Sequence, residues 1–253
     1  MKIEGDKKVK ELKITIALLT FFIFLSPLCI AEILVDDSFE DYEVGKNPPA
    51  PWEPLVRNAD DGGLFQVDDT VVFEGAKSLH MVDTPSDWSS FGAKFESNAR
   101  FITYELHAYT ELDDLRTMIM IMSSDNIQAD ADDGKANYVA FMGSGFIEYH
   151  DGAWHPVTDY KVKTWHRLAC EVNLDTQTYA LYVDDMTKPV VEAAAFWHPV
   201  EKLSYAIIRG SPQGGPYWVD NVFVYEGKVG EESKAVEPVG KMTTSWGVIK
   251  RQY

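Results

Sequence analysis

The chain has 253 residues, of which 45% are hydrophobic and 13% aromatic, so it is long and apolar enough for one domain with a sizeable core. Its 23 Lys and Arg against 40 Asp and Glu give a formal net charge of −17, a field that opposes the approach of a phosphate backbone. The composition therefore excludes a disordered chain and argues against a nucleic-acid partner.

The N-terminus predicts an export signal over residues 1–31. Five lysines in the first 13 residues precede an apolar run from Ile14 to Ala31, and Cys29 and Ala31 are small residues suited to cleavage after Ala31. A lipoprotein would need a small residue where Leu28 stands. An uncleaved leader would be the chain's contact with a membrane, although its 18 residues are few for a spanning helix. We expect a secreted, periplasmic or cell-surface protein, and the sequence does not fix its oligomeric state.

From Glu32 to Gly227 the chain alternates short β-like runs with Gly, Pro, Asn and Asp, which predicts an all-β domain at 32–227. One open sheet of this size would leave long edges and a bare apolar face, so we expect a two-sheet antiparallel β-sandwich. The expected strands are residues 32–39, 64–69, 70–73, 77–83, 92–96, 100–110, 115–124, 137–143, 146–152, 165–175, 178–185, 204–210 and 217–227.

Three further segments have their own signals. Residues 43–54 hold four prolines, so they are expected to form an extended surface connection, with Trp52 covering one end of the core. Cys170 shares the inward register of its strand with Leu168 and Val172, which predicts a buried, inert thiol. After Gly227 the alternation ends, so residues 228–253 are expected to be a flexible tail.

Residues 143–185, "GSGFIEYHDGAWHPVTDYKVKTWHRLACEVNLDTQTYALYVDD", resemble the centre of the concanavalin A-like lectin/glucanase group, also known as the laminin-G-like jelly roll. The matching positions are Trp165, Asp175, Thr176, Thr178, Tyr182 and Asp184, whereas Asp185 stands where that group usually has Gly. The resemblance extends more loosely over residues 33–227 and implies a jelly roll whose first and last strands pair. The fold hosts lectins, adhesion modules, glycosidases and polysaccharide lyases, so it does not define an activity.

The resemblance also implies a calcium site. In the β-glucanases of this group, the positions that match Glu40, Gly75 and Asp220 bind one structural Ca²⁺. Two carboxylates and a backbone carbonyl are suitable ligands for this hard cation.

Known catalytic motifs of the group are missing. The β-glucanases carry Glu-x-Asp-x-x-Glu on one strand, but Glu105 is followed by Leu106 and His107, so no catalytic residue is assigned. Alternation turns Glu105 and His107 outward on one strand, and Glu148 and His150 outward on another. With Tyr138 and Arg209 they could form one polar face on the concave sheet, which a glycosidase or polysaccharide lyase would use.

Sugar binding requires flat rings near hydrogen-bonding groups. Aromatic residues in or beside loops supply such rings at Trp88, Trp154, Trp197, Tyr217 and Trp218, while Trp165 is expected in the core. The predicted ligand-binding set is Trp88, Glu105, His107, Tyr138, Glu148, His150, Trp154, Arg209 and Tyr217. The sequence thus predicts an exported carbohydrate-binding domain whose partner is a polysaccharide or glycan, with an enzyme or a cell-surface adhesion module as alternatives.

Overall fold

The computed structural model describes residues 31–55, 65–81, 89–124, 134–211 and 215–231. The predicted leader, Trp88 and the tail beyond residue 231 lie outside these ranges. The described residues contain strands and connecting loops but no helix, and therefore none that could cross a membrane.

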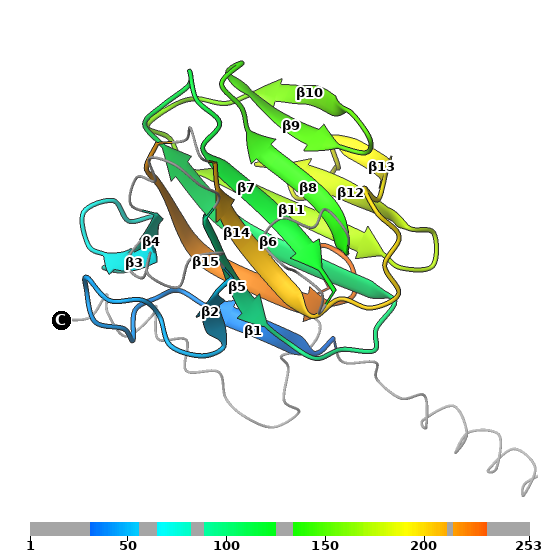
Figure 1. The fold of residues 1–253 in the computed structure, drawn as a ribbon, viewed down its shortest axis with the longest axis horizontal. Helices are drawn as coiled ribbons and strands as arrows, with labels where there is room; N and C mark the ends of the chain where they lie inside the picture. Colours follow the sequence, from blue (N-terminus) through cyan, green and yellow to red (C-terminus); the bar gives the residue numbers. More distant parts are fainter. Residues whose placement is uncertain (1–30, 56–64, 82–88, 125–133, 212–214, 232–253) are drawn as a thin grey trace, which may run out of the picture. The chain divides into compact units, whose positions relative to one another are not determined.

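The strands form two antiparallel sheets (Figure 1). Sheet A contains β1 (Ile33–Asp37), β3 (Phe65–Asp68), β4 (Ser78–Met81), β6 (Phe101–Thr110), β11 (His166–Asn173), β12 (Thr178–Val183), β13 (Val191–Ala195) and β15 (Tyr217–Glu226). Sheet B contains β2 (Trp52–Pro54), β5 (Ser89–Lys94), β7 (Met118–Ser123), β8 (Lys135–Phe141), β9 (Phe146–His150), β10 (Trp154–Asp159) and β14 (Tyr205–Gly210). This confirms the predicted β-sandwich.

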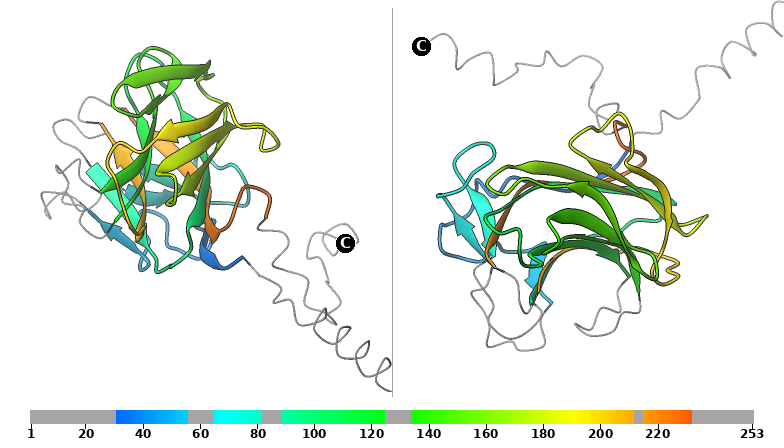
Figure 2. Two further views of the ribbon diagram at one scale, coloured as in Figure 1. Left: turned by 90° about the vertical axis from the view of Figure 1, so that its right-hand side faces the viewer. Right: turned by 90° about the horizontal axis from the view of Figure 1, so that it is seen from above.

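The strand order is β13-β12-β11-β6-β15-β4-β3 in sheet A, with β1 on β15, and β10-β9-β8-β7-β14-β5-β2 in sheet B. The first and last strands pair as expected, with Val35 opposite Val224. Figure 2 shows the two sheets stacked as layers, with sheet B curved so that its outer face is hollow. The two outer faces therefore point in opposite directions.

Strand alternation assigns side chains to the core between the sheets. Leu106 and Ala108 of β6, and Val222 and Val224 of β15, lie in the core between the sheets. Cys170 is fully buried there, and burial raises the pKa of its thiol far above its usual value. The predicted inert thiol is therefore in place.

One end of the core is closed by the proline-rich connection. Trp52 is 4% exposed and stacks on Phe91 with ring centroids 5.4 Å apart. Its indole Nε1 donates a 2.6 Å hydrogen bond to Asp37, which also accepts from the Phe39 amide and the Tyr42 hydroxyl. This buried carboxylate is satisfied by three donors, as a buried charge must be, and it fixes the connection to β1.

Candidate functional site

A group of four touching rings lies on the outer face of sheet B and is called here the aromatic cluster: Tyr138 of β8, His150 of β9, Trp154 of β10 and Trp197, which follows β13. Trp197 stacks on His150 at 3.8 Å and meets Tyr138 edge-on at 4.9 Å. Trp154 meets the same two rings at 5.1 and 5.4 Å. Antiparallel pairing sets His150 opposite Trp154, so two predicted ligand residues are cross-strand neighbours.

Two cations approach the rings of the aromatic cluster. The Lys135 ammonium lies 5.7 Å from the Tyr138 ring centroid and 5.8 Å from that of Trp197. The Arg116 guanidinium lies 5.5 Å from the Trp154 ring centroid. These are cation–π distances, so positive charge is held against the rings of an otherwise acidic chain.

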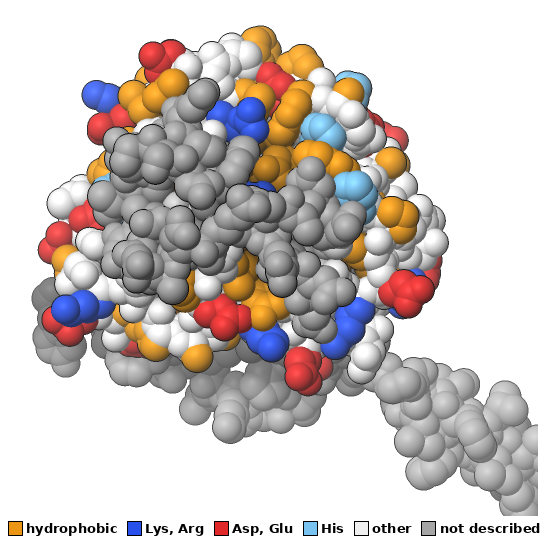
Figure 3. Space-filling view, in the orientation of Figure 1, with side chains coloured by type: hydrophobic (Ala, Val, Ile, Leu, Met, Phe, Trp, Pro, Cys, Tyr) orange, Lys and Arg blue, Asp and Glu red, His pale blue; other side chains and the backbone are white. Residues whose placement is uncertain are grey.

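Two more predicted residues share this face. Arg209 of β14 pairs with Ile119 of β7, Ile119 pairs with Ala140 of β8, and Ala140 pairs with Glu148 of β9. Arg209 and Glu148 therefore lie in one row across the sheet, one step from the aromatic cluster. Figure 3 looks onto this face and shows histidine and hydrophobic side chains gathered at its upper right.

Glu105 and His107 lie elsewhere, because β6 belongs to sheet A. The predicted polar face that would combine them with Glu148 and His150 is not formed, since the two pairs lie on the outer faces of opposite sheets. Sequence alternation identifies which residues point outward, but not the sheet to which each strand belongs.

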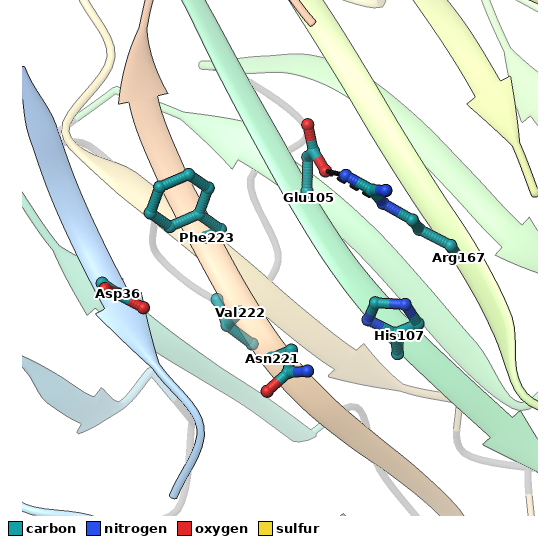
Figure 4. Close-up of a pocket in the computed structure, with 7 residues that line it drawn as sticks. All are labelled: Asp36, Glu105, His107, Arg167, Asn221, Val222 and Phe223. Atoms are coloured by element: carbon teal, nitrogen blue, oxygen red, sulfur yellow. Dashed lines mark hydrogen bonds and ion pairs between the residues drawn. The ribbon is translucent and has the colours of Figure 1, made fainter. Parts of the chain in front are cut away.

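Glu105 and His107 instead line a small pocket on the outer face of sheet A, with Asp36, Arg167, Asn221 and Phe223 (Figure 4). Glu105 is buried. Its carboxylate accepts a 3.1 Å hydrogen bond from Arg167 Nε and a 2.6 Å hydrogen bond from the Tyr225 hydroxyl. Burial, with the Arg167 charge adding to it, lowers the pKa of His107 to about 4. The sequence analysis did not single out Arg167, although its outward register in β11 matches that of the neighbouring Glu171.

Two aromatic residues were placed wrongly from the sequence. Tyr217 is 1% exposed in the core, because the strand β15 begins at this residue and turns its side chain inward. Trp165 is half-buried outside the core, with its ring 5.8 Å from Phe73 and 5.5 Å from Tyr109. It lies two residues before Arg167 and therefore continues the outward register of β11.

The predicted calcium residues do meet. Glu40 Oε1 accepts hydrogen bonds from the amides of Ala76 and Lys77, and an added Cβ at Gly75 would lie 2.3 Å from that oxygen. Asp220 accepts from the amides of Phe73 and Glu74 in the same turn.

A cation of the chain already lies beside this turn, since Lys77 Nζ donates hydrogen bonds to the carbonyl oxygens of Glu40 and Tyr42. Burial raises the pKa of Asp220 to about 6, and the nearby Glu40 carboxylate adds to the rise. Among the described residues no group of three or more His, Cys, Asp or Glu side chains could hold a metal, so further ligands would be carbonyl or water oxygens.

Comparisons with known proteins identify the fold. No family model and no curated protein matches the sequence. A solved structure named "Sialidase" superposes with a TM-score of 0.56 at 14% identity, over 78% of this chain and 19% of its own, so the chain spans about a fifth of that protein. The chain has a concanavalin A-like jelly-roll fold.

Two other solved structures superpose on this chain over nearly their whole lengths. One, described with endo-acting O-glycanases of the human gut microbiota that initiate mucin breakdown, has a TM-score of 0.55 at 15% identity, over 78% of this chain and 100% of its own. The other is the catalytic domain of a glycoside hydrolase family 131 protein from Coprinopsis cinerea, with a TM-score of 0.54 at 12% identity, over 78% and 97%. At these identities the likeness concerns the fold alone.

Proposed function

We propose that this chain binds carbohydrate through the aromatic cluster on the outer face of sheet B. The observation that carries the proposal is the contact between Tyr138, His150, Trp154 and Trp197, with Lys135 and Arg116 at cation–π distance. Sugar rings stack their C–H faces on such rings, while nearby polar groups bond the hydroxyls. Carbohydrate activity in the names of proteins with the same fold supports the same class of ligand.

A glycan array with the full-length chain tests this proposal. Trp154→Ala should weaken binding to at least one of the glycans that the wild type retains by about tenfold or more, since stacking is lost. Tyr182→Ala, a half-exposed aromatic residue of β12 in sheet A, is the matched control and should bind as the wild type does. Equal binding by Trp154→Ala and wild type would exclude the aromatic cluster as the site.

The enzyme alternative is tested on the same glycans. His150 of the aromatic cluster and Glu148 both belong to β9 and face outward, so a hydrolase or lyase acting from this face is the second candidate. Binding without products supports the binding domain. New reducing ends or unsaturated sugars, lost in His150→Gln, would support the enzyme.

We also propose that Glu40, Gly75 and Asp220 bind a structural Ca²⁺. A cation there would offset the repulsion between two carboxylates that approach one turn. Binding to the folded state alone raises the unfolding temperature, so we expect calcium to raise it by several degrees over EDTA in the wild type but not in Asp220→Asn. An unfolding temperature of the wild type that is the same in calcium and in EDTA would refute the site.

Finally, we propose that residues 1–31 direct export to the cell surface, the periplasm or the medium. Fractionation of producing bacterial cells followed by N-terminal sequencing tests this. A mature N-terminus at Glu32 supports the proposal, and full-length protein in the cytoplasm opposes it.

A further inference from the structure

The outer face of sheet A has a second row of rings, separate from the aromatic cluster. Phe73 stacks on His107 with centroids 3.8 Å apart, and Trp165 lies edge-on to Phe73 and tilted against Tyr109. Phe73 is 42% exposed, and Trp165 and Tyr109 are partly exposed. This row, called here the second platform, therefore presents aromatic surface to solvent on the side of the sandwich opposite the aromatic cluster.

The pocket beside the second platform supplies polar groups at the end of the row (Figure 4). Its volume is about 180 Å³, and His107 belongs to both the pocket and the platform. Pockets for drug-sized ligands hold roughly 300–1,000 Å³. The pocket is therefore sized for one small unit of a ligand rather than for a whole drug-sized molecule.

The charges in the pocket favour an uncharged ligand. Arg167 pairs with the buried Glu105, and Asp36 remains as an exposed carboxylate on β1. The lining is thus net negative and opposes a carboxylated or sulfated group, while its donors and acceptors match the hydroxyls of a sugar.

His107 lines the pocket, and its Nδ1 is buried without a hydrogen-bond partner among the described residues. The backbone also bends here, because Asn221 has a φ of 47° within a β-bulge between Asp220 and Phe223. Bulges re-aim side chains near sites, and this one brings Asn221 into the pocket lining.

We propose that the outer face of sheet A is a second carbohydrate site, which takes one neutral sugar unit in the pocket and stacks the adjoining unit on Phe73 and Trp165. This goes beyond the proposed function, because the two sites lie on opposite outer faces of the sandwich (Figure 2). One domain then holds two glycan chains at once and links them. The two sites also differ in charge, since the aromatic cluster has cations against its rings and the pocket lining is net negative.

Saturation-transfer NMR on the full-length chain tests the second site. The probes are the methyl glycosides of glucose, galactose, mannose and xylose, with methyl glucuronoside as the charged counterpart. Trp154→Ala disables the aromatic cluster, whereas Arg167→Met and Phe73→Ala each disable the second site. Arg100→Met is the control for the loss of an arginine, since Arg100 forms an exposed ion pair with Asp175 away from the pocket.

At least one neutral glycoside should bind Trp154→Ala and Arg100→Met as it binds the wild type, and should bind Arg167→Met and Phe73→Ala about tenfold or more weakly. Methyl glucuronoside should bind the second site about tenfold more weakly than the neutral form. Loss of all neutral binding in Trp154→Ala, unchanged binding in Arg167→Met, or no neutral binding at all would overturn the second site. Binding of every glycoside by Trp154→Ala equal to the wild type, with losses in Arg167→Met and Phe73→Ala, would instead count against the proposed function alone, so the two failures are distinguishable.

Folding is checked separately for each variant. Thermal unfolding of Arg167→Met and Phe73→Ala should remain cooperative, because neither side chain lies in the core between the sheets. Arg167→Lys provides a milder change that keeps the charge but loses the guanidinium fork. It should bind the neutral glycoside more weakly than the wild type, and binding equal to the wild type would remove Arg167 from the site.

Discussion

The protonation of His107 gives a quantitative test of the second platform. Burial and the Arg167 charge lower the pKa of His107 from 6.5 to about 4. A histidine whose pKa is lower in the folded state stabilises the fold fully above its unfolded pKa, and this contribution is lost as the pH falls from 6.5 toward 4. The folded state must then either protonate a half-buried ring or unfold.

The size of the loss follows from linkage. At pH 4.5 almost every unfolded chain has a protonated His107, while most folded chains do not, so the group removes about 2 kcal/mol of unfolding free energy relative to pH 7.5. His107→Gln has no titrating ring and avoids this loss. Its unfolding free energy relative to the wild type should therefore rise by about 2 kcal/mol from pH 7.5 to pH 4.5.

Urea unfolding of both proteins, followed by tryptophan fluorescence at the two pH values, measures this difference. Other titrating groups are common to both proteins and cancel. A change in the difference below about 0.5 kcal/mol would refute the buried, neutral state of the ring. An NMR titration of the His107 ring in the folded protein gives the pKa directly, and a value near 6.5 would refute the same reasoning.

Three further predictions concern the fold. Gly75→Ala should destabilise the protein more than Gly45→Ala, because both glycines have φ near +80° but only a Cβ at position 75 would meet Glu40. In urea unfolding we expect Gly75→Ala to lower the unfolding free energy by about 1–2 kcal/mol more than Gly45→Ala does. Equal losses of unfolding free energy would show that the Glu40 side chain moves aside freely. Asp37→Ala should cost about 3 kcal/mol, since three donors lose a charged acceptor, and a loss under 1 kcal/mol in the same assay would contradict that role. Cys170 should resist iodoacetamide in buffer and react in urea, as mass spectrometry can show, and fast labelling of the folded chain would contradict its burial.

The sequence by itself determined the class of fold and the orientation of most side chains. Alternation with a period of two defined which residues of the central strands face inward, as for Leu106 and Ala108 in β6 and for Val222 and Val224 in β15. The strands that sequence analysis missed, β2, β10 and β13, all lie at the ends of the sheets. An edge strand pairs on one side only and tolerates the prolines at positions 54 and 156, so its pattern is weak.

Only the tertiary structure decided which outward residues meet. Glu105 and Glu148 each face outward on an alternating strand, followed two residues later by an outward histidine. Their strands nevertheless belong to opposite sheets, β6 to sheet A and β9 to sheet B, because strands far apart in the chain pair within each sheet. The same long-range pairing brings Trp197, which follows a strand of sheet A, onto His150 of sheet B. A local pattern shows which face of its strand a residue occupies, but the partners of that face come from segments far away in the chain, so both candidate sites required the assembled fold.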